Sequence, residues 1–191
     1  MKKLNKVVAG FACLFLSAGV VAQGVTDDEV VFGTSTALSG PAALWGVAAS
    51  QAAQIRFDMA NEKGGVHGRQ IRVVLEDHQY QVPIHVKAMN KLLNLDKVFA
   101  TFNVLGTPMN IATAETQFAQ NVPMLFPMTT AQSVQEPEHD LKLTFGSSYY
   151  RQIRFAVSHF LATGRTSVCV MYQDTDYGAE VLEAVTDEVA D

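Results

Sequence analysis

The segment VVFGTSTALSGPAALWG, residues 30–46, joins a short apolar run to a loop of small residues that carries the only tryptophan of the chain, Trp45. The apolar run belongs to a predicted buried strand over residues 29–35, and the residues after the loop predict a helix over 47–63. Four apolar residues spaced 4, 3 and 4 apart would form the inner face of that helix: Ala48, Ala52, Ile55 and Met59. A strand that leads through a small-residue loop into a helix is typical of a βαβ unit, so this segment predicts an α/β fold.

The alternation of strand and helix continues along the chain. Further strands are predicted at 70–77, 97–103, 122–128, 141–146 and 167–172. Further helices are predicted with inner faces at Val82, Val86, Met89 and Leu93, then at Ile111, Ala114 and Phe118, and with starts at Thr107, at Ser147 or Ser148, and at 178. The apolar, non-alternating strands favour a mostly parallel sheet covered on both faces. Ligands bind at the carboxyl ends of such strands, so the candidate binding loops are 34–46, 77–81, 103–108, 127–131 and 173–178.

Residues 1–22 are expected to be a cleavable secretory signal peptide. The sequence MKKLNK is positively charged, and residues 7–21 are apolar but too short to span a bilayer comfortably. Small residues precede a plausible cleavage point before Gln23. An uncleaved N-terminal anchor is the alternative, whereas bulky Phe11 just before Cys13 does not suit a lipoprotein signal.

The chain that remains after cleavage would be strongly acidic. Loss of three signal-peptide lysines leaves 11 of the 14 basic residues against 19 acidic ones, a net charge of −8. Such a chain, without a basic run, argues against nucleic acid and anionic membranes as partners. Only Cys169 would remain, so an intrachain disulfide is excluded, which suits a bacterial periplasm. Cys169 is expected to be a small buried hydrophobic residue.

Motifs for catalysis and for cofactor binding are missing from the sequence. It contains no GxGxxG, GxxxxGK[ST] or GxSxG pattern, which argues against a nucleotide site and a hydrolase elbow. The five histidines show no metal-ligand spacing and are expected to be solvated or structural. Asp77 is the best candidate acid, but no nucleophile is paired with it. The sequence therefore predicts a protein that is not an enzyme and that needs neither cofactor nor metal.

Two loops carry neutral hydrogen-bonding groups instead. The loop NVLGTPMN places a glycine, a hydroxyl and a helix start after the third predicted strand, and PMTT adds two hydroxyls after the fourth. Free N–H groups at a helix start attract an anion such as a carboxylate. This arrangement favours holding a small ligand over transforming one.

Several spaced motifs resemble the N-terminal lobe of the leucine/isoleucine/valine-binding protein family, the periplasmic substrate-binding proteins of ABC transporters. The motifs are residues 30–46, DMANEKGGVHGRQIRVVLED (58–77), FNVLGTPMN (102–110), NVPMLFPMTTA (121–131), LTFGSSYYRQ (143–152) and VMYQDTDYG (170–178). The resemblance covers about residues 28–191 and implies the type I periplasmic-binding-protein fold, a parallel sheet flanked by helices in each of two lobes that close on a ligand. It implies a first lobe over 23–146 and the start of a second lobe over 147–191. Because members of this family are usually about twice as long, the chain is expected to be truncated and to lack the segments that return to complete the first lobe.

The same resemblance implies the ligand-binding residues. They are Trp45 as an aromatic wall, Leu105, Gly106 and Thr107 after the third strand, Met128 through its backbone, Thr130 through its hydroxyl, and Tyr149 and Tyr150 as further contacts. Packing of Trp45 on its own helix is the alternative for that residue. The implied function is a periplasmic solute-binding component of an ABC importer, working with permease subunits on an amino acid or a similar carboxylate-bearing ligand. The alternative is a ligand-sensing module of a regulator or receptor with the same fold.

Overall fold

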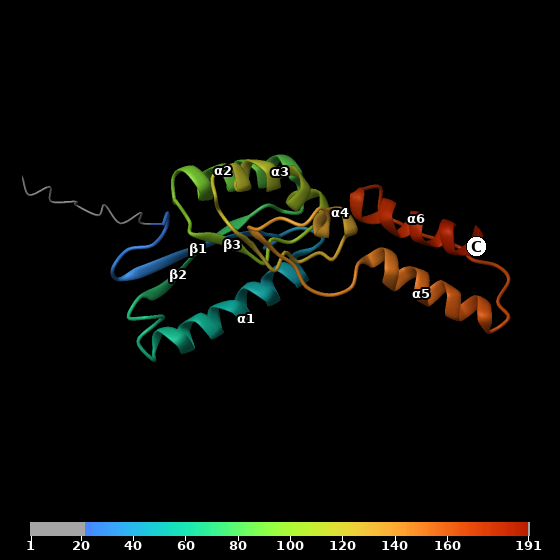
Figure 1. Ribbon diagram of the computed structural model, residues 1–191, viewed down its shortest axis with the longest axis horizontal. Coiled ribbons are helices and arrows are strands. Elements are labelled where there is room, and N and C mark those ends of the chain that lie inside the picture. Colours follow the sequence, from blue (N-terminus) through green and yellow to red (C-terminus); the bar gives the residue numbers. More distant parts are fainter. Residues whose placement is uncertain (1–21, 191) are drawn as a thin grey trace, which may run out of the picture.

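The computed structural model describes residues 22–190, so the signal peptide expected over 1–22 lies outside the described residues, apart from its last position. The strands are β1 (Glu29–Thr36), β2 (Gln70–Asp77), β3 (Ala100–Phe102), β4 (Met124–Leu125) and β5 (Lys142–Leu143). The helices are α1 (Ala43–Asn61), α2 (Val82–Asn94), α3 (Thr107–Ala119), α4 (Gln132–Gln135), α5 (Tyr149–Ala162) and α6 (Asp176–Ala190). Figure 1 shows a sheet with helices on both faces and, beside it, a pair formed by α5 and α6. Within residues 22–190, no helix is long and apolar enough to cross a membrane.

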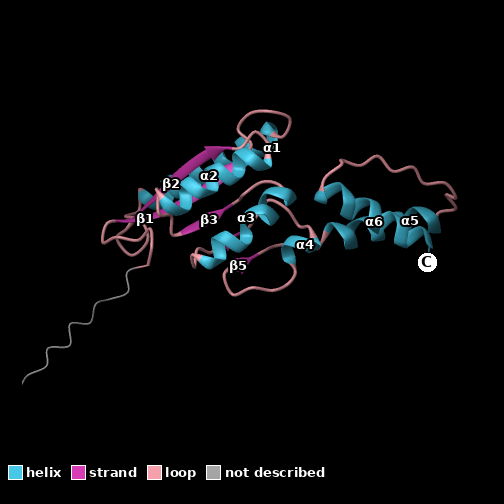
Figure 2. Ribbon diagram, turned by 90° about the horizontal axis from the view of Figure 1, so that it is seen from above, coloured by secondary structure: helices cyan, strands magenta, loops and turns pink. Residues whose placement is uncertain are grey.

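The described strands form one parallel sheet in the order β2-β1-β3-β4-β5. β1 and β2 pair along their whole length, from Glu29 opposite Gln70 to Thr36 opposite Asp77. Helices α2 and α3 cover one face of the sheet, and α1 lies against the other (Figures 1 and 2). The predicted α/β fold with a parallel, helix-flanked sheet is confirmed, although β3, β4 and β5 are shorter than the strands predicted there.

An apolar cluster between β1 and α2 forms the main core. Val31 of β1 packs with Met89, Leu92 and Leu93 of α2, and these four side chains are almost fully buried. Met89 and Leu93 are buried as predicted, because the 4-3-4 spacing places them on the side of α2 that faces the sheet. His85 is buried on the same helix. The core therefore lies between the amino-terminal half of β1 and the C-terminal half of α2.

The face of α1 that packs on the sheet is not the predicted one. All four residues of the predicted inner face are exposed, and Ile55 is 60% exposed. Phe57 packs on the sheet instead, with its ring centroid 5.9 Å from that of Phe32 and 5.3 Å from that of Phe102. An aromatic ring buries more apolar area than the alanines of the predicted face, so it sets the rotation of the helix.

Gly46 brings the first turn of α1 against the end of β1. A Cβ at Gly46 would lie 2.0 Å from the carbonyl oxygen of Ala37 and 2.8 Å from Thr36 Oγ1, so only glycine fits. The helix accordingly begins at Ala43, earlier than the predicted residue 47. Trp45 therefore lies in the first turn of α1 and not in the preceding loop.

Apart from Met109, the fully buried residues of α3 are polar, which differs in part from the prediction; Ala114 and Phe118 are half-buried and pack against the apolar cluster of Met124, Ala131 and Val134, as predicted. Ile111, on the predicted inner face, is 41% exposed. Asn110, Thr113 and Gln117 are buried instead. The side-chain amide of Asn110 donates to the carbonyl oxygens of Val104 (3.0 Å) and Gly106 (2.8 Å), and that of Gln117 donates to Thr101 Oγ1 at 2.8 Å. These hydrogen bonds fix α3 on the strand ends, which apolar contacts alone would not specify.

The segment after α5 departs from the sequence prediction as well. Residues 167–172 were predicted to form a strand, but the structure assigns them no strand. A parallel strand needs a hydrogen-bonded neighbour, and no neighbour is present among residues 22–190. Cys169 lies in this segment and is exposed, so the prediction that it is buried is wrong.

Candidate ligand-binding site

The carboxyl ends of the parallel strands converge on a cleft with a volume of about 610 Å³. All the predicted site residues except Tyr150 line it. The complete lining is Pro41, Ala42, Trp45, Tyr80, Leu105, Gly106, Thr107, Met128, Thr129, Thr130, Phe145, Tyr149, Gln152, Gln173 and Tyr177. The structure thus brings together all five loops that the sequence singled out, including the loop after β2, which contributes Tyr80.

The loop after β3 forms the floor of the cleft. Gly106 has a φ of 107°, and a Cβ there would lie 2.9 Å from Met109 Sδ and 3.2 Å from Tyr80 Cε2. Glycine is therefore required for the loop to turn into α3 beneath the ring of Tyr80. Thr107 is the first residue of α3, where the sequence predicted the helix to start. The residue before the helix is Gly106, and no side chain caps this end.

The hydroxyl of Thr107 is paired with a second hydroxyl from the loop after β4. Thr107 Oγ1 lies 2.7 Å from Thr129 Oγ1, and both residues are buried. Thr129 Oγ1 also accepts the N–H of Ala131 at 3.2 Å. When Thr129 donates its proton to Thr107, the proton of Thr107 is free to meet an acceptor in the cleft. Together with the amide groups at the start of α3, this end of the cleft is suited to an anion.

The backbone of Met128 is largely used by the sheet. Its N–H donates to the carbonyl oxygen of Val104 at 2.9 Å, and its carbonyl oxygen accepts the N–H of Gly106 at 3.5 Å. A backbone contact from Met128 to a ligand would therefore have to come from the carbonyl oxygen. Thr130 Oγ1 accepts from Gln152 Nε2 at 3.4 Å, and the carbonyl oxygen of Thr130 accepts from the N–H of Tyr149 at 3.2 Å. These bonds tie the loop after β4 to the start of α5.

Asp77, at the end of β2, fastens the loop that leads to Trp45. Its carboxylate accepts from the N–H of Leu38 at 2.9 Å, from Ser39 Oγ at 2.6 Å and from the N–H of Gln79 at 2.9 Å. Burial alone would raise the pKa of Asp77, but the hydrogen bonds from Ser39, Gln79 and Leu38 together outweigh this effect, so the pKa is lowered from its usual value. The sequence marked this residue as a candidate acid, and the structure shows an ionised carboxylate that joins two loops of the cleft.

Replacing Asp77 with Asn should loosen this connection. The amide of Asn keeps one oxygen that can accept the N–H groups, but it lacks the negative charge and the second acceptor oxygen that Ser39 Oγ uses, so the hydrogen bonds weaken and we expect ligand binding to weaken by about fivefold. Hydrogen exchange should become faster at residues 38–46. The pKa of Asp77 is lowered in the folded state, so its stabilising contribution is complete above the usual carboxyl range and is lost as the pH falls through the folded pKa. Asp58→Asn, on the exposed side of α1, should leave exchange at residues 38–46 unchanged; equal effects of the two variants would contradict the proposed role.

His78 connects the loop after β2 to the loop after β3. Its Nδ1 accepts the N–H of Tyr80 at 2.9 Å, so the proton of the neutral ring is on Nε2, which donates to the carbonyl oxygen of Leu105 at 3.1 Å. Burial lowers the pKa of His78, although the Leu105 carbonyl and the charge of Asp77 act in the opposite direction. The histidine therefore positions two lining residues, Tyr80 and Leu105, while it stays outside the cleft. Its role is structural, one of the two roles expected from the sequence.

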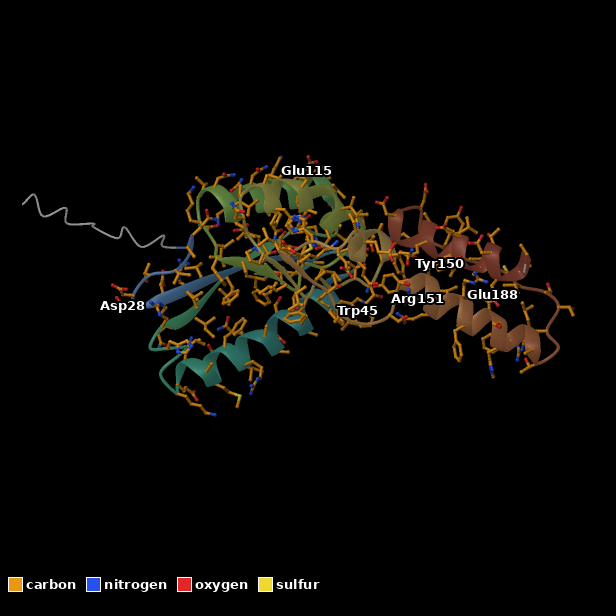
Figure 3. The ribbon with its side chains drawn as sticks, in the orientation of Figure 1. Asp28, Trp45, Glu115, Tyr150, Arg151 and Glu188 are labelled. Atoms are coloured by element: carbon orange, nitrogen blue, oxygen red, sulfur yellow. The ribbon has the colours of Figure 1, made fainter. Side chains whose placement is uncertain are left out.

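Three aromatic lining residues were missed by the sequence reasoning: Tyr80, Phe145 and Tyr177. Tyr149 and Tyr177 form an edge-to-face pair with ring centroids 5.1 Å apart. Trp45 is 65% exposed and stands at the end of α1 nearest α5 (Figure 3). Tyr80 and Tyr177 could have been found from the sequence, because both lie in loops that follow predicted strands. Such loops meet at one edge of a parallel sheet, where the cleft lies.

Tyr150 is the one predicted residue that does not line the cleft. Its hydroxyl donates to Asp187 Oδ2 at 2.6 Å, and Figure 3 shows the side chain between α5 and α6. The neighbouring Glu180 is buried and accepts from the N–H groups of Gln132 and Tyr150, both at 2.9 Å. Glu180 thus binds the first turns of α4 and α5 to α6, a connection that the sequence did not reveal.

Comparison with known proteins identifies a family and several solved structures that this chain resembles. A family model described as a periplasmic binding protein matches residues 29–191. A substrate-binding periplasmic protein from Ralstonia solanacearum is 26% identical, with a TM-score of 0.79 over 85% of this chain and 46% of that chain. A fatty acid ABC transporter substrate-binding protein from Thermomonospora curvata is 25% identical, with a TM-score of 0.77 over 88% of this chain and 43% of that chain.

A third similar structure is the substrate-binding protein of a branched-chain amino acid transporter from Streptococcus pneumoniae, solved in complex with isoleucine. It is 21% identical, with a TM-score of 0.74 over 84% of this chain and 47% of that chain. This chain therefore spans less than half the length of the solved structures that it matches. No curated protein sequence gives a match to it.

Proposed function

Because this chain belongs to the periplasmic binding protein family, we propose that the whole protein is the solute-binding component of an ABC importer. It holds a small carboxylate-bearing ligand between two lobes in the periplasm and presents it to permease subunits. The observation that carries this proposal is the cleft at the strand ends, where the described lining offers hydrogen-bonding, aromatic and aliphatic groups without a charged side chain. Such a lining can hold a ligand, but it offers no acid–base pair to transform one, so we propose binding without catalysis.

Each part of the cleft has a role in this proposal. The start of α3, at Gly106 and Thr107, receives the carboxylate, because helix amides and a hydroxyl proton meet there. Thr130 and the Met128 carbonyl oxygen contribute further hydrogen-bonding groups, and Leu105 closes the floor. Trp45 and Tyr149 form opposite apolar walls from α1 and α5.

Calorimetric titration of the full-length protein tests the proposal. A panel of branched-chain amino acids, aliphatic carboxylates and aromatic carboxylates should contain at least one ligand that binds with a Kd in the micromolar range or below. Absence of binding across the whole panel, together with binding of an uncharged sugar or a metal ion, would contradict the proposed ligand class. Turnover of a bound ester or amide would contradict the absence of catalysis.

Replacing Trp45 with Ala should weaken the binding of that ligand by about thirtyfold, since truncation of a tryptophan at the centre of a contact typically costs about 2 kcal/mol. Protein stability should change little because the side chain is 65% exposed. Leu44→Ala is the matched control, since Leu44 is the preceding residue, is 79% exposed and does not line the cleft. Equal affinities of Trp45→Ala and the unmodified protein would instead support packing of Trp45 on its own helix.

A further inference from the structure

One buried carboxylate connects segments of the chain from both sides of residue 147. Glu180 lies on α6 and is 7% exposed, and each of its carboxylate oxygens accepts one backbone N–H. Oε2 accepts at 2.9 Å from Gln132, the first residue of α4, and Oε1 accepts at 2.9 Å from Tyr150, in the first turn of α5. We propose that Glu180 is a joint between the two lobes, which holds α6 on α4 so that the lobes pivot about this contact without sliding over each other. This inference rests on the proposed function, with a first lobe over 23–146 and a second lobe that begins at 147.

Helices α5 and α6 are fastened to each other beyond the joint. The Tyr150 hydroxyl donates to Asp187 Oδ2 at 2.6 Å, and Arg154 Nε lies 2.6 Å from Glu188 Oε2. Both contacts lie about two turns further along α6 than Glu180, and Figure 3 shows Tyr150 and Glu188 between the two helices. A displacement of α6 therefore carries α5 with it.

Helix α4 connects this helix pair to the cleft. It begins two residues after Thr130, which lines the cleft, and Figures 1 and 2 show it between the sheet and the pair formed by α5 and α6. Val134 of α4 is buried in one apolar cluster with Met124 of β4. The apolar side of α4 thus fixes it to the first lobe, while its first N–H group, at Gln132, reaches Glu180 in the second.

A carboxylate suits this position for two physical reasons. The N–H groups in the first turn of a helix have no partner within the helix, so they need an acceptor from elsewhere. An ionised carboxylate, in turn, can be buried only where hydrogen bonds replace its water. The two N–H groups at Glu180 meet both needs, and hydrogen bonds to an ionised group are about twice as strong as neutral ones. Sliding of α6 away from α4 would leave a buried charge with half of its partners.

The joint keeps one corner of the cleft constant. Tyr177, in the first turn of α6, and Tyr149, at the start of α5, both line the cleft, and their rings meet edge to face at 5.1 Å. The carbonyl oxygen of Thr130 accepts the N–H of Tyr149 at 3.2 Å. With Glu180 in place, these three lining residues keep their relative positions while the rest of the second lobe moves.

Distances between the lobes, measured by pulsed electron spin resonance on the ligand-free full-length protein, test the joint. Spin labels are attached at Gln51→Cys on α1 and Ser158→Cys on α5, which are both exposed, after every native cysteine is replaced by serine. Glu180→Gln keeps the shape of the side chain but turns one acceptor oxygen into an NH2 group, which opposes one of the two N–H groups. We expect the distribution of label distances to become at least about twofold wider, and hydrogen exchange at Gln132 or Tyr150 to become about tenfold faster.

Two further variants separate a joint from a local helix cap. Glu183→Gln is the matched control, one turn further along α6 and exposed, and should leave both readouts unchanged. Gln132→Pro removes only the N–H that reaches Glu180 from the first lobe. Proline is well tolerated at the first position of a helix, so this variant should widen the distribution as Glu180→Gln does.

A distance distribution as narrow as that of Glu183→Gln in both variants would overturn the inference, because faster exchange alone is what a local cap predicts. If Glu180→Gln does not fold, Gln132→Pro decides the outcome by itself. The measurements need no ligand, so a failure of the joint is distinguishable from a failure of the proposed function, which the calorimetric titration tests.

Discussion

Lowering the pH from about 7.5 to about 5 should reduce the free energy of unfolding by about 2 kcal/mol through His85 alone. His85 is fully buried, and its burial, aided by neighbouring His78, lowers its pKa from the usual 6.5 to about 3. The unfolded chain therefore takes up a proton below pH 6.5 that the folded chain does not take up. The stabilising contribution is complete above this pH and is lost progressively as the pH falls towards the folded pKa.

The hydrogen bonds of His85 explain why it stays neutral. The Thr113 hydroxyl donates to the Met109 carbonyl oxygen, so it accepts from His85 Nε2 at 3.0 Å. The other ring nitrogen, Nδ1, then accepts from the Ser35 hydroxyl at 3.0 Å. Both nitrogens are satisfied in the neutral ring, and charging the ring would bury a cation without a carboxylate partner between β1, α2 and α3.

Urea unfolding at the two pH values measures this effect. His85→Gln should have a smaller loss of stability on acidification, because the side chain that titrates only in the unfolded state is gone. His159→Gln, which is exposed on α5, serves as the control and should keep the slope of the unmodified protein. Equal slopes for all three proteins would show that His85 does not carry the acid sensitivity. His78 acts in the same direction, since burial also lowers its pKa.

Replacing Gly106 with Ala should destabilise the fold by about 3 kcal/mol and abolish measurable ligand binding. The φ of 107° is strained for any residue with a Cβ, and the added carbon would lie 2.9 Å from Met109 Sδ and 3.2 Å from Tyr80 Cε2. Met109 is fully buried and cannot move away without opening the core. Relief of the contact would therefore displace Tyr80 and the start of α3, which form the floor of the cleft.

Gly64→Ala is the matched control for this prediction. Gly64 lies just after the end of α1 and has a φ of 95°, but a Cβ at this position would meet no atom within 4 Å. It should therefore cost about 1–2 kcal/mol through backbone strain and leave ligand affinity unchanged. Thermal unfolding and calorimetry compare the two variants. An affinity for Gly106→Ala within about threefold of that of Gly64→Ala would contradict the close packing of Tyr80 on the loop.

Apart from the short helix α4 and the strand predicted at 167–172, the sequence was sufficient to predict the order of the elements and the edge of the sheet where the cleft lies. Apolar runs without alternation predicted parallel strands, and the loops after them contain most of the lining. The rotation of α1 and α3 could not be predicted in this way. In α1 two faces carry apolar residues, and the ring of Phe57 decides between them. In α3 most of the buried residues are polar, and only the positions of the strand ends show that Asn110 and Gln117 have partners.

The missed and misplaced site residues have a similar physical cause. Tyr80 contacts the cleft because Gln79 and Tyr80 both have positive φ, at 53° and 58°, which turns the chain back over Gly106. Non-glycine residues rarely take a positive φ, so no local sequence pattern predicts this turn. Tyr149 and Tyr150 are adjacent on α5 and therefore point in different directions; the structure turns Tyr149 to the cleft and Tyr150 to Asp187.

The position of Trp45 makes intrinsic tryptophan fluorescence a probe of the cleft. Trp45 is the only tryptophan in the sequence, so all indole emission of the protein comes from one wall of the cleft. Three of the five tyrosines, Tyr80, Tyr149 and Tyr177, line the same cleft and can transfer excitation energy to it. Under the proposed function, a ligand that enters, or a second lobe that closes over the indole, would change the polarity around the indole and its distance from these donors. Occupancy and closure can thus be followed without any attached dye.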